Sequence, residues 1–354
     1  MSNTHALTKE RDYWFDNAKA FLVITVVIGH LIQIIVNQAE FTGTYSWLRT
    51  VYLSIYTFHM PVFLIISGRF SKKRVDRNDW VMVINKMVIP YIIIQLLMAL
   101  LYRIVGFGKP AFSLISPLFS LWYIITIAVY QLITPHLIKF KWLLPASFLV
   151  ALICSFQKFA FFGGLQRVFT FYPFFLFGYY TSTHSFKYCK KWFFRCIAIL
   201  AFIALPFVIY YFKDSLDVQL FTGKKVYSYF FDEFGVSKLE HLMALLLRYL
   251  VGVLFFCFVM ALSPCKKNIF SRVGADSIYV YILQAFLYVG ICGLENHLDI
   301  LHLNSDIVAA IIIIAMPLLS LFLVSPFVKK LTSWFIAPNI DITKTFEKIK
   351  DARK

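Results

Sequence analysis

Charged residues are scarce in this chain. Asp, Glu, Lys and Arg together make up 15% of its 354 residues, and only 18 side chains are acidic. Hydrophobic residues make up 60%, whereas ordinary soluble domains contain about 45–50%. The composition therefore excludes a soluble globular domain and indicates a membrane protein.

Several local patterns are also missing. The six cysteines form no Cys-x-x-Cys pair, which argues against a zinc site or a disulfide framework. There is no low-complexity tract, and there is no internal repeat of the kind that marks many transporters. We expect one compact membrane domain without a bound metal.

The most prominent feature of the sequence is a series of long apolar stretches. A helix needs about 20 residues to cross a bilayer, and these stretches are continuously apolar rather than alternating. They favour helices over a barrel because a helix satisfies its own backbone in lipid. The sequence predicts an all-α polytopic membrane protein with about ten transmembrane helices. The expected spans are 20–38, 50–70, 81–102, 117–134, 143–161, 167–182, 194–212, 243–262, 275–293 and 307–328.

The formal net charge of +17 raises the possibility of nucleic-acid binding, but the distribution of Lys and Arg argues against it. Basic residues gather in loops that face the cytoplasm if the N-terminus is inside, such as 72–77 and 187–195. This asymmetry follows the positive-inside rule. It predicts cytoplasmic N- and C-termini and a multi-pass protein of the plasma membrane, with the lipid bilayer as its partner and no nucleic acid.

We divide the chain into a cytoplasmic N-terminal segment (1–19), a membrane domain (20–330) and a basic cytoplasmic tail (331–354). No small-residue cleavage site follows the first apolar run, so that run is expected to be a retained span. The longest outer loop, about 213–242, mixes acidic and aromatic residues. It either lines an outward-facing site or forms an interfacial aromatic belt.

The first expected span carries an unusual polar stripe of Asp16, Lys19 and His30. Lys19 and His30 are separated by three helical turns plus about 20°, so they share a helix face about 16 Å apart along the axis. Ionisable residues inside a membrane are costly and usually face a cavity or a partner. His30 is therefore the first candidate for function, with packing as the alternative.

A second histidine, His59, is expected at a similar depth in the following span, where it either faces His30 or packs against a carbonyl group. On the cytoplasmic side the loop after this span holds Arg74 and Arg77, and Lys86 follows just inside the third span. Such cations suit a phosphate-rich ligand. The alternative is an ordinary positive-inside loop.

These residues carry a family resemblance. Lys19, ten intervening residues and His30 resemble the Arg/Lys-x10-His signature of the acyltransferase-3 family of integral membrane acyltransferases. The order of further segments is similar to its sugar O-acetylase branch, often described as fucose 4-O-acetylase-like. These segments are Asp16–Phe21, Phe58–Pro61 with Ser67-Gly68, Ile89–Tyr91, Leu121–Tyr123, Tyr172–Tyr180 and Gly274–Leu283.

The resemblance implies an enzyme that transfers an acetyl group from cytoplasmic acetyl-CoA to a hydroxyl of a capsular or other envelope polysaccharide, or of its lipid-linked precursor. By the family pattern His30 is the essential histidine and Lys19 its basic partner. Arg74 and Arg77 match a cytoplasmic Arg-x-x-Arg motif, with Lys86 sharing the role. Gln284 departs from many relatives, which have His there.

Acyl transfer to a hydroxyl at neutral pH needs a base, and His30 is the expected one. Either His30 deprotonates the acceptor for direct attack on the thioester, or an imidazole, of His30 or His59, first takes the acetyl group. Asp16 and Lys19 are too far away to touch His30 and are assigned to the cytoplasmic mouth. Trp122 and Arg167, near expected span ends, are candidates for donor or acceptor contacts.

A rival class is a transporter or flippase for glycans or small solutes, because polar residues in mid-membrane also mark transport pathways. The lack of an inverted repeat argues against it. A scaffold in envelope assembly is favoured only if His30 is dispensable.

Overall fold

The computed structural model describes residues 11–39, 46–107, 113–114, 116–157, 164–298 and 306–341. Within these residues all regular secondary structure is helical. The longer helices are α1 (Tyr13–Ala39), α2 (Ser46–Asp76), α4 (Ile89–Ile104), α5 (Trp122–Leu137), α6 (Leu143–Cys154), α7 (Leu165–Tyr180), α8 (Trp192–Phe212), α11 (Lys238–Leu262), α13 (Ser277–Leu298), α14 (Asp306–Leu323) and α15 (Pro326–Ile336). The shorter ones are α3 (Trp80–Val83), η1 (Ile84–Val88), η2 (Phe119–Leu121), η3 (Thr183–Lys190), α9 (Gln219–Thr222), α10 (Tyr227–Phe234) and α12 (Ser271–Ala275).

The prediction of an all-helical membrane protein is confirmed. Each of the expected apolar stretches contains a helix, and six helices in the described ranges are long and apolar enough to cross a membrane. A seventh span is possible if the bent pair Ile313–Leu323 and Pro326–Ile336, which meet at 73°, is counted as one. Helices α5, α6 and α7 have 16, 12 and 16 residues, fewer than the roughly 20 that a bilayer requires. The count of ten and the side of each terminus stay predictions.

Helix α1 begins at Tyr13, about two turns before the expected start of the first span. The extra turns contain polar groups, and these have partners. Asn17 Nδ2 donates to the carbonyl groups of Pro264 and Lys266 at 2.8 and 2.9 Å, and Asn17 Oδ1 accepts from Ser271 Oγ at 2.7 Å. Because these contacts satisfy the buried amide, the helix continues past the edge of its apolar run.

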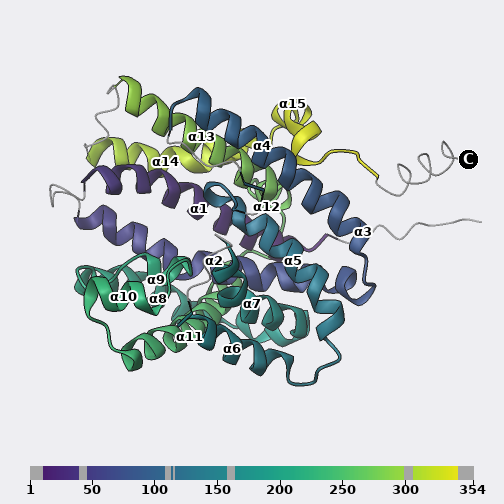
Figure 1. Ribbon diagram of the computed structural model, residues 1–354, viewed down its shortest axis with the longest axis vertical. Coiled ribbons are helices and arrows are strands. Elements are labelled where there is room, and N and C mark those ends of the chain that lie inside the picture. The colour runs from purple at the N-terminus through teal and green to yellow at the C-terminus, as the bar shows by residue number, and fades with distance from the viewer. Residues whose placement is uncertain are drawn as a thin grey trace, which may run out of the picture.

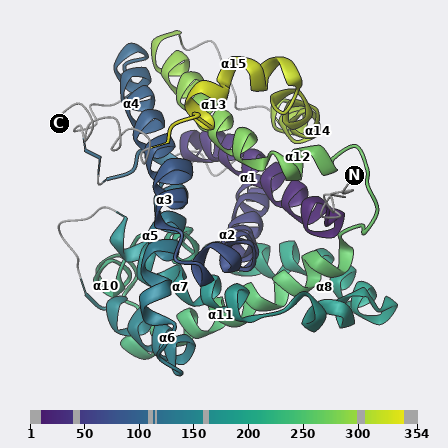
Figure 2. The same ribbon diagram turned by 90° about the vertical axis from the view of Figure 1, so that its right-hand side faces the viewer.

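Helices α1 and α2 lie side by side at the centre of the molecule (Figure 1). Helix α1 packs against α12, α13 and α14, whereas α2 packs against α5, α7, α8 and α11. Figure 2 shows the result: α12 to α15 gather on one side of the central pair, and α6 to α11 gather on the other. The short helices α9 and α10 lie at the end of the bundle opposite the connection from α2 to α3 (Figure 1).

The contact between α2 and α7 depends on two glycines. A Cβ atom at Gly68 would collide with the carbonyl oxygen of Phe175, and a Cβ atom at Gly178 would collide with that of Ile65. The two backbones are therefore in direct contact, as small residues allow between membrane helices. This contact determines how closely α7, and the helices packed on it, approach α2.

We predict that Gly178→Ala destabilises the protein by about 1–3 kcal/mol or more, because the new methyl group overlaps a backbone that cannot move freely. Gly290→Ala is the matched control, since no described atom outside the backbone of its own helix and its two chain neighbours lies within 4 Å of the added Cβ. This variant should be neutral or stabilising. Thermal unfolding followed by size-exclusion chromatography in detergent compares the two. Equal midpoints would contradict the packing argument.

Candidate active site

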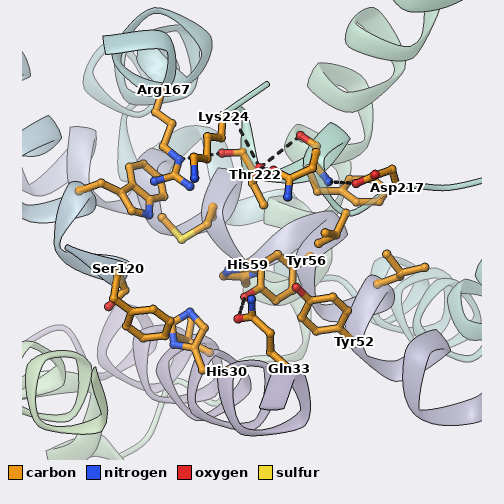
Figure 3. Close-up of a pocket in the computed structure, with 18 of the residues that line it drawn as sticks. His30, Gln33, Tyr52, Tyr56, His59, Ser120, Arg167, Asp217, Thr222 and Lys224 are labelled. Atoms are coloured by element: carbon orange, nitrogen blue, oxygen red, sulfur yellow. Dashed lines mark hydrogen bonds between the residues drawn. The ribbon is translucent and has the colours of Figure 1, made fainter. Parts of the chain in front are cut away.

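A cavity of about 660 Å³ lies between the central helices and the segment of α9 and α10. Helices α1 and α2 form one wall, and η2, the start of α5, the start of α7 and the segment 217–229 form most of the remainder (Figure 3). Its lining residues include His30, Gln33, Arg49, Tyr52, Tyr56, His59, Phe119, Ser120, Trp122, Arg167, Asp217, Thr222, Lys224, Tyr229 and Tyr281.

His30 is buried, and α13 determines the position of its proton. His30 Nδ1 lies 3.0 Å from Gln284 Oε1, while Gln284 Nε2 donates to the carbonyl of Tyr281 at 3.0 Å. The second bond orients the amide so that its oxygen faces the imidazole. Because an amide oxygen can only accept, Nδ1 of His30 carries the proton and Nε2 of the neutral ring keeps its lone pair.

His59 lines the same cavity as His30, and it also makes the contact with a carbonyl group that was the alternative for this residue. Its Nδ1 lies 2.8 Å from the carbonyl oxygen of Ile55, one turn earlier in α2. The carbonyl accepts, so Nδ1 again donates and Nε2 is left as the acceptor. The cavity therefore contains two imidazoles whose Nε2 atoms are both able to take a proton.

Arg167 and Lys224 lie across the cavity from His30 (Figure 3). Arg167 Nε donates to the carbonyl of Thr222 at 3.1 Å, and its guanidinium lies over the ring of Trp122, 4.6 Å from the centroid. Partial burial, together with the positive charges of Arg167 and Lys225, lowers the pKa of the Lys224 ammonium. The structure thus brings Trp122 and Arg167 together on the wall opposite His30 (Figure 3).

The loop expected at about 213–242 contributes much of the cavity wall. Asp217, Thr222, Lys224 and Tyr229 all line it. Asp217 accepts from the backbone N–H of Gln219 at 2.6 Å and from the hydroxyl of Tyr229 at 2.9 Å, which ties the loop to itself. This placement corresponds to the first of the two alternatives for the loop, a site-lining segment.

A second, smaller cavity of about 160 Å³ is lined by residues that include Lys19, Ser67, Tyr123 and Ser277. Val26, Met60 and Tyr281 line both this cavity and the larger one, so the two cavities meet at these three side chains. Lys19 and His30 accordingly lie in different cavities along the same helix. The structure does not bring them into contact.

Lys19 is not an isolated cation. Its Nζ lies 2.8 Å from Asp16 Oδ1, and Arg11 Nε lies 2.6 Å from Asp16 Oδ2. Asp16 is buried, and each of its two oxygens has a cationic partner. Asp16 therefore holds Lys19 in place and does not itself line either cavity.

Arg74, Arg77 and Lys86 lie away from both cavities, at the end of the bundle that carries the connection from α2 to α3. Asp76 accepts from the hydroxyl of Tyr179 at 2.5 Å and lies 3.9 Å from Lys72, and Asp79 caps α3. These acidic residues form no salt bridge with Arg74 or Arg77 among the described residues. Lys86 is exposed in the π-helical turn η1.

The model of an acyltransferase domain family matches residues 12–326, which is nearly the whole chain. The chain belongs to the acyltransferase-3 family. The family resemblance read from the sequence is thus confirmed, and the apolar helices agree with a family of membrane proteins.

The acyltransferase also resembles two curated proteins over short regions. Both are described as nodulation protein NolL: one from Mesorhizobium japonicum is 43% identical over 74 residues, and one from Sinorhizobium fredii is 39% identical over 72 residues. The first match covers 21% of this chain and 19% of the relative, the second 20% and 18%. The chain therefore matches only about a fifth of each relative's length. No solved structure is significantly similar.

In the described part of the acyltransferase, no three His, Cys, Asp or Glu side chains lie close enough together to hold a metal ion. Two features of the site were missed in the sequence. Gln284 stood out only as a departure from the family, and Lys224 was one of several loop lysines. An isolated amide in an apolar span is a usable signal for Gln284, whereas nothing in its local sequence distinguishes Lys224.

We predict that Gln284→Leu lowers the turnover of acyl transfer by about tenfold or more, because it removes the acceptor that holds the His30 proton on Nδ1 and a positioned base contributes about 10²–10⁴-fold. The Michaelis constants should change little. Gln284→His restores an acceptor nitrogen and should recover part of the rate. Unchanged turnover in Gln284→Leu across the pH range would show that Gln284 only fills space.

Proposed function

We propose that this acyltransferase is an O-acetyltransferase of the plasma membrane, which moves an acetyl group from cytoplasmic acetyl-CoA to a hydroxyl of a cell-surface or other envelope polysaccharide, or of its lipid-linked precursor. The observation that supports this most directly is the His30–Gln284 pair at the larger cavity. Its geometry presents an unprotonated Nε2 to a space large enough for part of a glycan.

His30 is the proposed general base. A sugar hydroxyl is a weak nucleophile at neutral pH, and a base that removes its proton during attack lowers the barrier. Nε2 of His30 takes this proton while Gln284 Oε1 accepts from Nδ1–H and stabilises the resulting imidazolium. The same imidazolium then protonates the departing thiolate, so His30 returns to its neutral form.

The donor side is proposed to be the smaller cavity and the end of the bundle beneath it. Arg74, Arg77 and Lys86 supply cations for the phosphates of acetyl-CoA. Lys19 is paired with Asp16 and lines the smaller cavity, and we assign it to the cytoplasmic mouth. From Lys19 to His30 is about 16 Å along α1. An extended thioester arm of that length reaches from the mouth to the base.

The role of His59 distinguishes two versions of the mechanism. In direct transfer, His59 Nε2 binds the acceptor beside His30. In the two-step version, one of the two imidazoles carries the acetyl group between half-reactions. Incubation of the purified protein with radiolabelled acetyl-CoA and no acceptor separates the two versions. Only the two-step version leaves an acetyl-imidazole label on the protein, which neutral hydroxylamine releases and which is lost in the His30→Gln or the His59→Gln variant.

We predict that His30→Ala abolishes acetyl-ester formation on the surface glycan, because the only base positioned by Gln284 is removed. The ester content is measured by NMR before and after mild base, in cells that produce the wild type, the variant or neither. Expression and membrane insertion of the variant should match the wild type. Full acetylation by His30→Ala would contradict the assignment, and a change in the amount of polymer rather than in its esters would favour a transporter.

The double variant Arg74→Ala with Arg77→Ala should raise the KM for acetyl-CoA by about tenfold or more, since charge-assisted contacts to phosphate contribute about 1.5–3 kcal/mol each. Turnover at saturating donor should change little. Lys73→Ala, an exposed residue of the same helix end, is the control. An unchanged donor KM in the double variant would remove both arginines from the site.

A further inference from the structure

We propose that the acceptor of this enzyme is anionic, and that Arg167 and Lys224 bind its negative charge while the hydroxyl to be acylated lies at His30. This inference rests on the proposed function and specifies the class of acceptor. The negative group is a carboxylate or a phosphate diester, which present the same charged oxygens to a guanidinium and an ammonium.

Arg167 is built into the wall in a way that leaves its outer nitrogens for a ligand. Its Nε is used by the carbonyl of Thr222, and its planar face rests on Trp122. In the described part of the chain its two terminal nitrogens have no protein acceptor, and it forms no salt bridge. A guanidinium held by its Nε and its face is oriented to offer both terminal nitrogens to one carboxylate or phosphate.

Lys224 adds a second positive charge at the same wall (Figure 3). The two side chains are close enough for Arg167 to depress the pKa of Lys224. Two cations placed together repel each other, and no described carboxylate forms a salt bridge with either. The repulsion between these two like charges costs free energy, and an anion that binds between them lowers that cost.

The described acidic side chain that lines the cavity, Asp217, forms no salt bridge with Arg167 or Lys224. Both oxygens of Asp217 are occupied, by the N–H of Gln219 and the hydroxyl of Tyr229. Among the described residues that line the cavity, Asp217 is one carboxylate, whereas Arg167 and Lys224 are two cations without a salt bridge. These three side chains together leave an excess of positive charge where the acceptor binds.

The position of the charges relative to His30 fixes how such an acceptor lies. The cations lie across the cavity from His30 (Figure 3), so the anionic group and the reacting hydroxyl occupy opposite ends of the bound unit. The rings of Tyr52 and Tyr56, whose centroids are 4.5 Å apart, line the same cavity and provide apolar surface for a sugar ring. A neutral glycan would leave both cations unpaired in a partly enclosed space.

The first test locates the ester. Surface glycan is isolated from cells with and without the protein, and two-dimensional NMR identifies the sugar that loses its acetyl group. An ester on an acidic sugar, or on a sugar joined to a phosphate diester, supports the proposal and distinguishes the two sources of charge. An ester on a glycan without acidic or phosphorylated units overturns it. No loss of ester in cells without the protein overturns the proposed function itself.

The second test measures the contribution of the charge. The de-O-acetylated glycan from cells without the protein serves as acceptor, and radiolabelled acetyl-CoA as donor, for the purified protein. Lys224→Gln should raise the KM for this glycan by about tenfold, the effect of one charge-assisted hydrogen bond, with the donor KM unchanged. Lys224→Arg should retain most of the affinity. Arg167→Gln should act in the same direction, but its bond to Thr222 also supports the wall.

Lys225→Gln is the matched control, since Lys225 is the neighbouring lysine and does not line the cavity. Its acceptor KM should equal that of the wild type. The KM of the wild type should rise with ionic strength and that of Lys224→Gln should rise less. An equal acceptor KM in Lys224→Gln and Lys225→Gln, at low and at high salt, would overturn the proposal while leaving the transferase activity established.

Discussion

The structure depends on how the polar groups of α1 are satisfied inside an apolar helix bundle. A polar side chain removed from water costs free energy unless it has a partner, and α1 buries Asp16, Asn17 and His30. Each finds one: Arg11 and Lys19 for Asp16, the connection before α12 for Asn17, and Gln284 of α13 for His30. The contacts of Asn17 and His30 join α1 to the C-terminal part of the chain, and the bond that makes the burial of His30 tolerable also sets the orientation of the proposed base.

The central pair of helices, α1 and α2, contributes side chains to both cavities. Helix α1 carries Lys19 toward one cavity and His30 toward the other, and Val26, Met60 and Tyr281 stand where the cavities meet. Helix α2 contributes His59 to the larger cavity, and its tight glycine contact with α7 holds the wall that bears Arg167. Helix α1 therefore contributes to both cavities, and the packing of α7 against α2 places the wall with Arg167 opposite His30.

Much of this arrangement could be predicted from residue patterns alone. The apolar stretches identify the helices because a chain in lipid must satisfy its backbone within each segment. His30 and Lys19 stand out because ionisable groups are rare in such stretches, and their spacing of three turns already separates them along the helix. The start of α1 was placed about two turns too late, because the partners of Asn17 lie some 250 residues away in the chain.

By itself the sequence determined the membrane class, the helical architecture, the family and the two polar positions of α1, because composition and helical periodicity are local properties. Only the tertiary structure decided which nitrogen of His30 holds its proton, that Gln284 takes the place of a family histidine beside it, and that Arg167 and Lys224 form the facing wall. Those relations join residues between 57 and 254 positions apart. No local spacing encodes them, since they arise only when helices from different parts of the chain pack together.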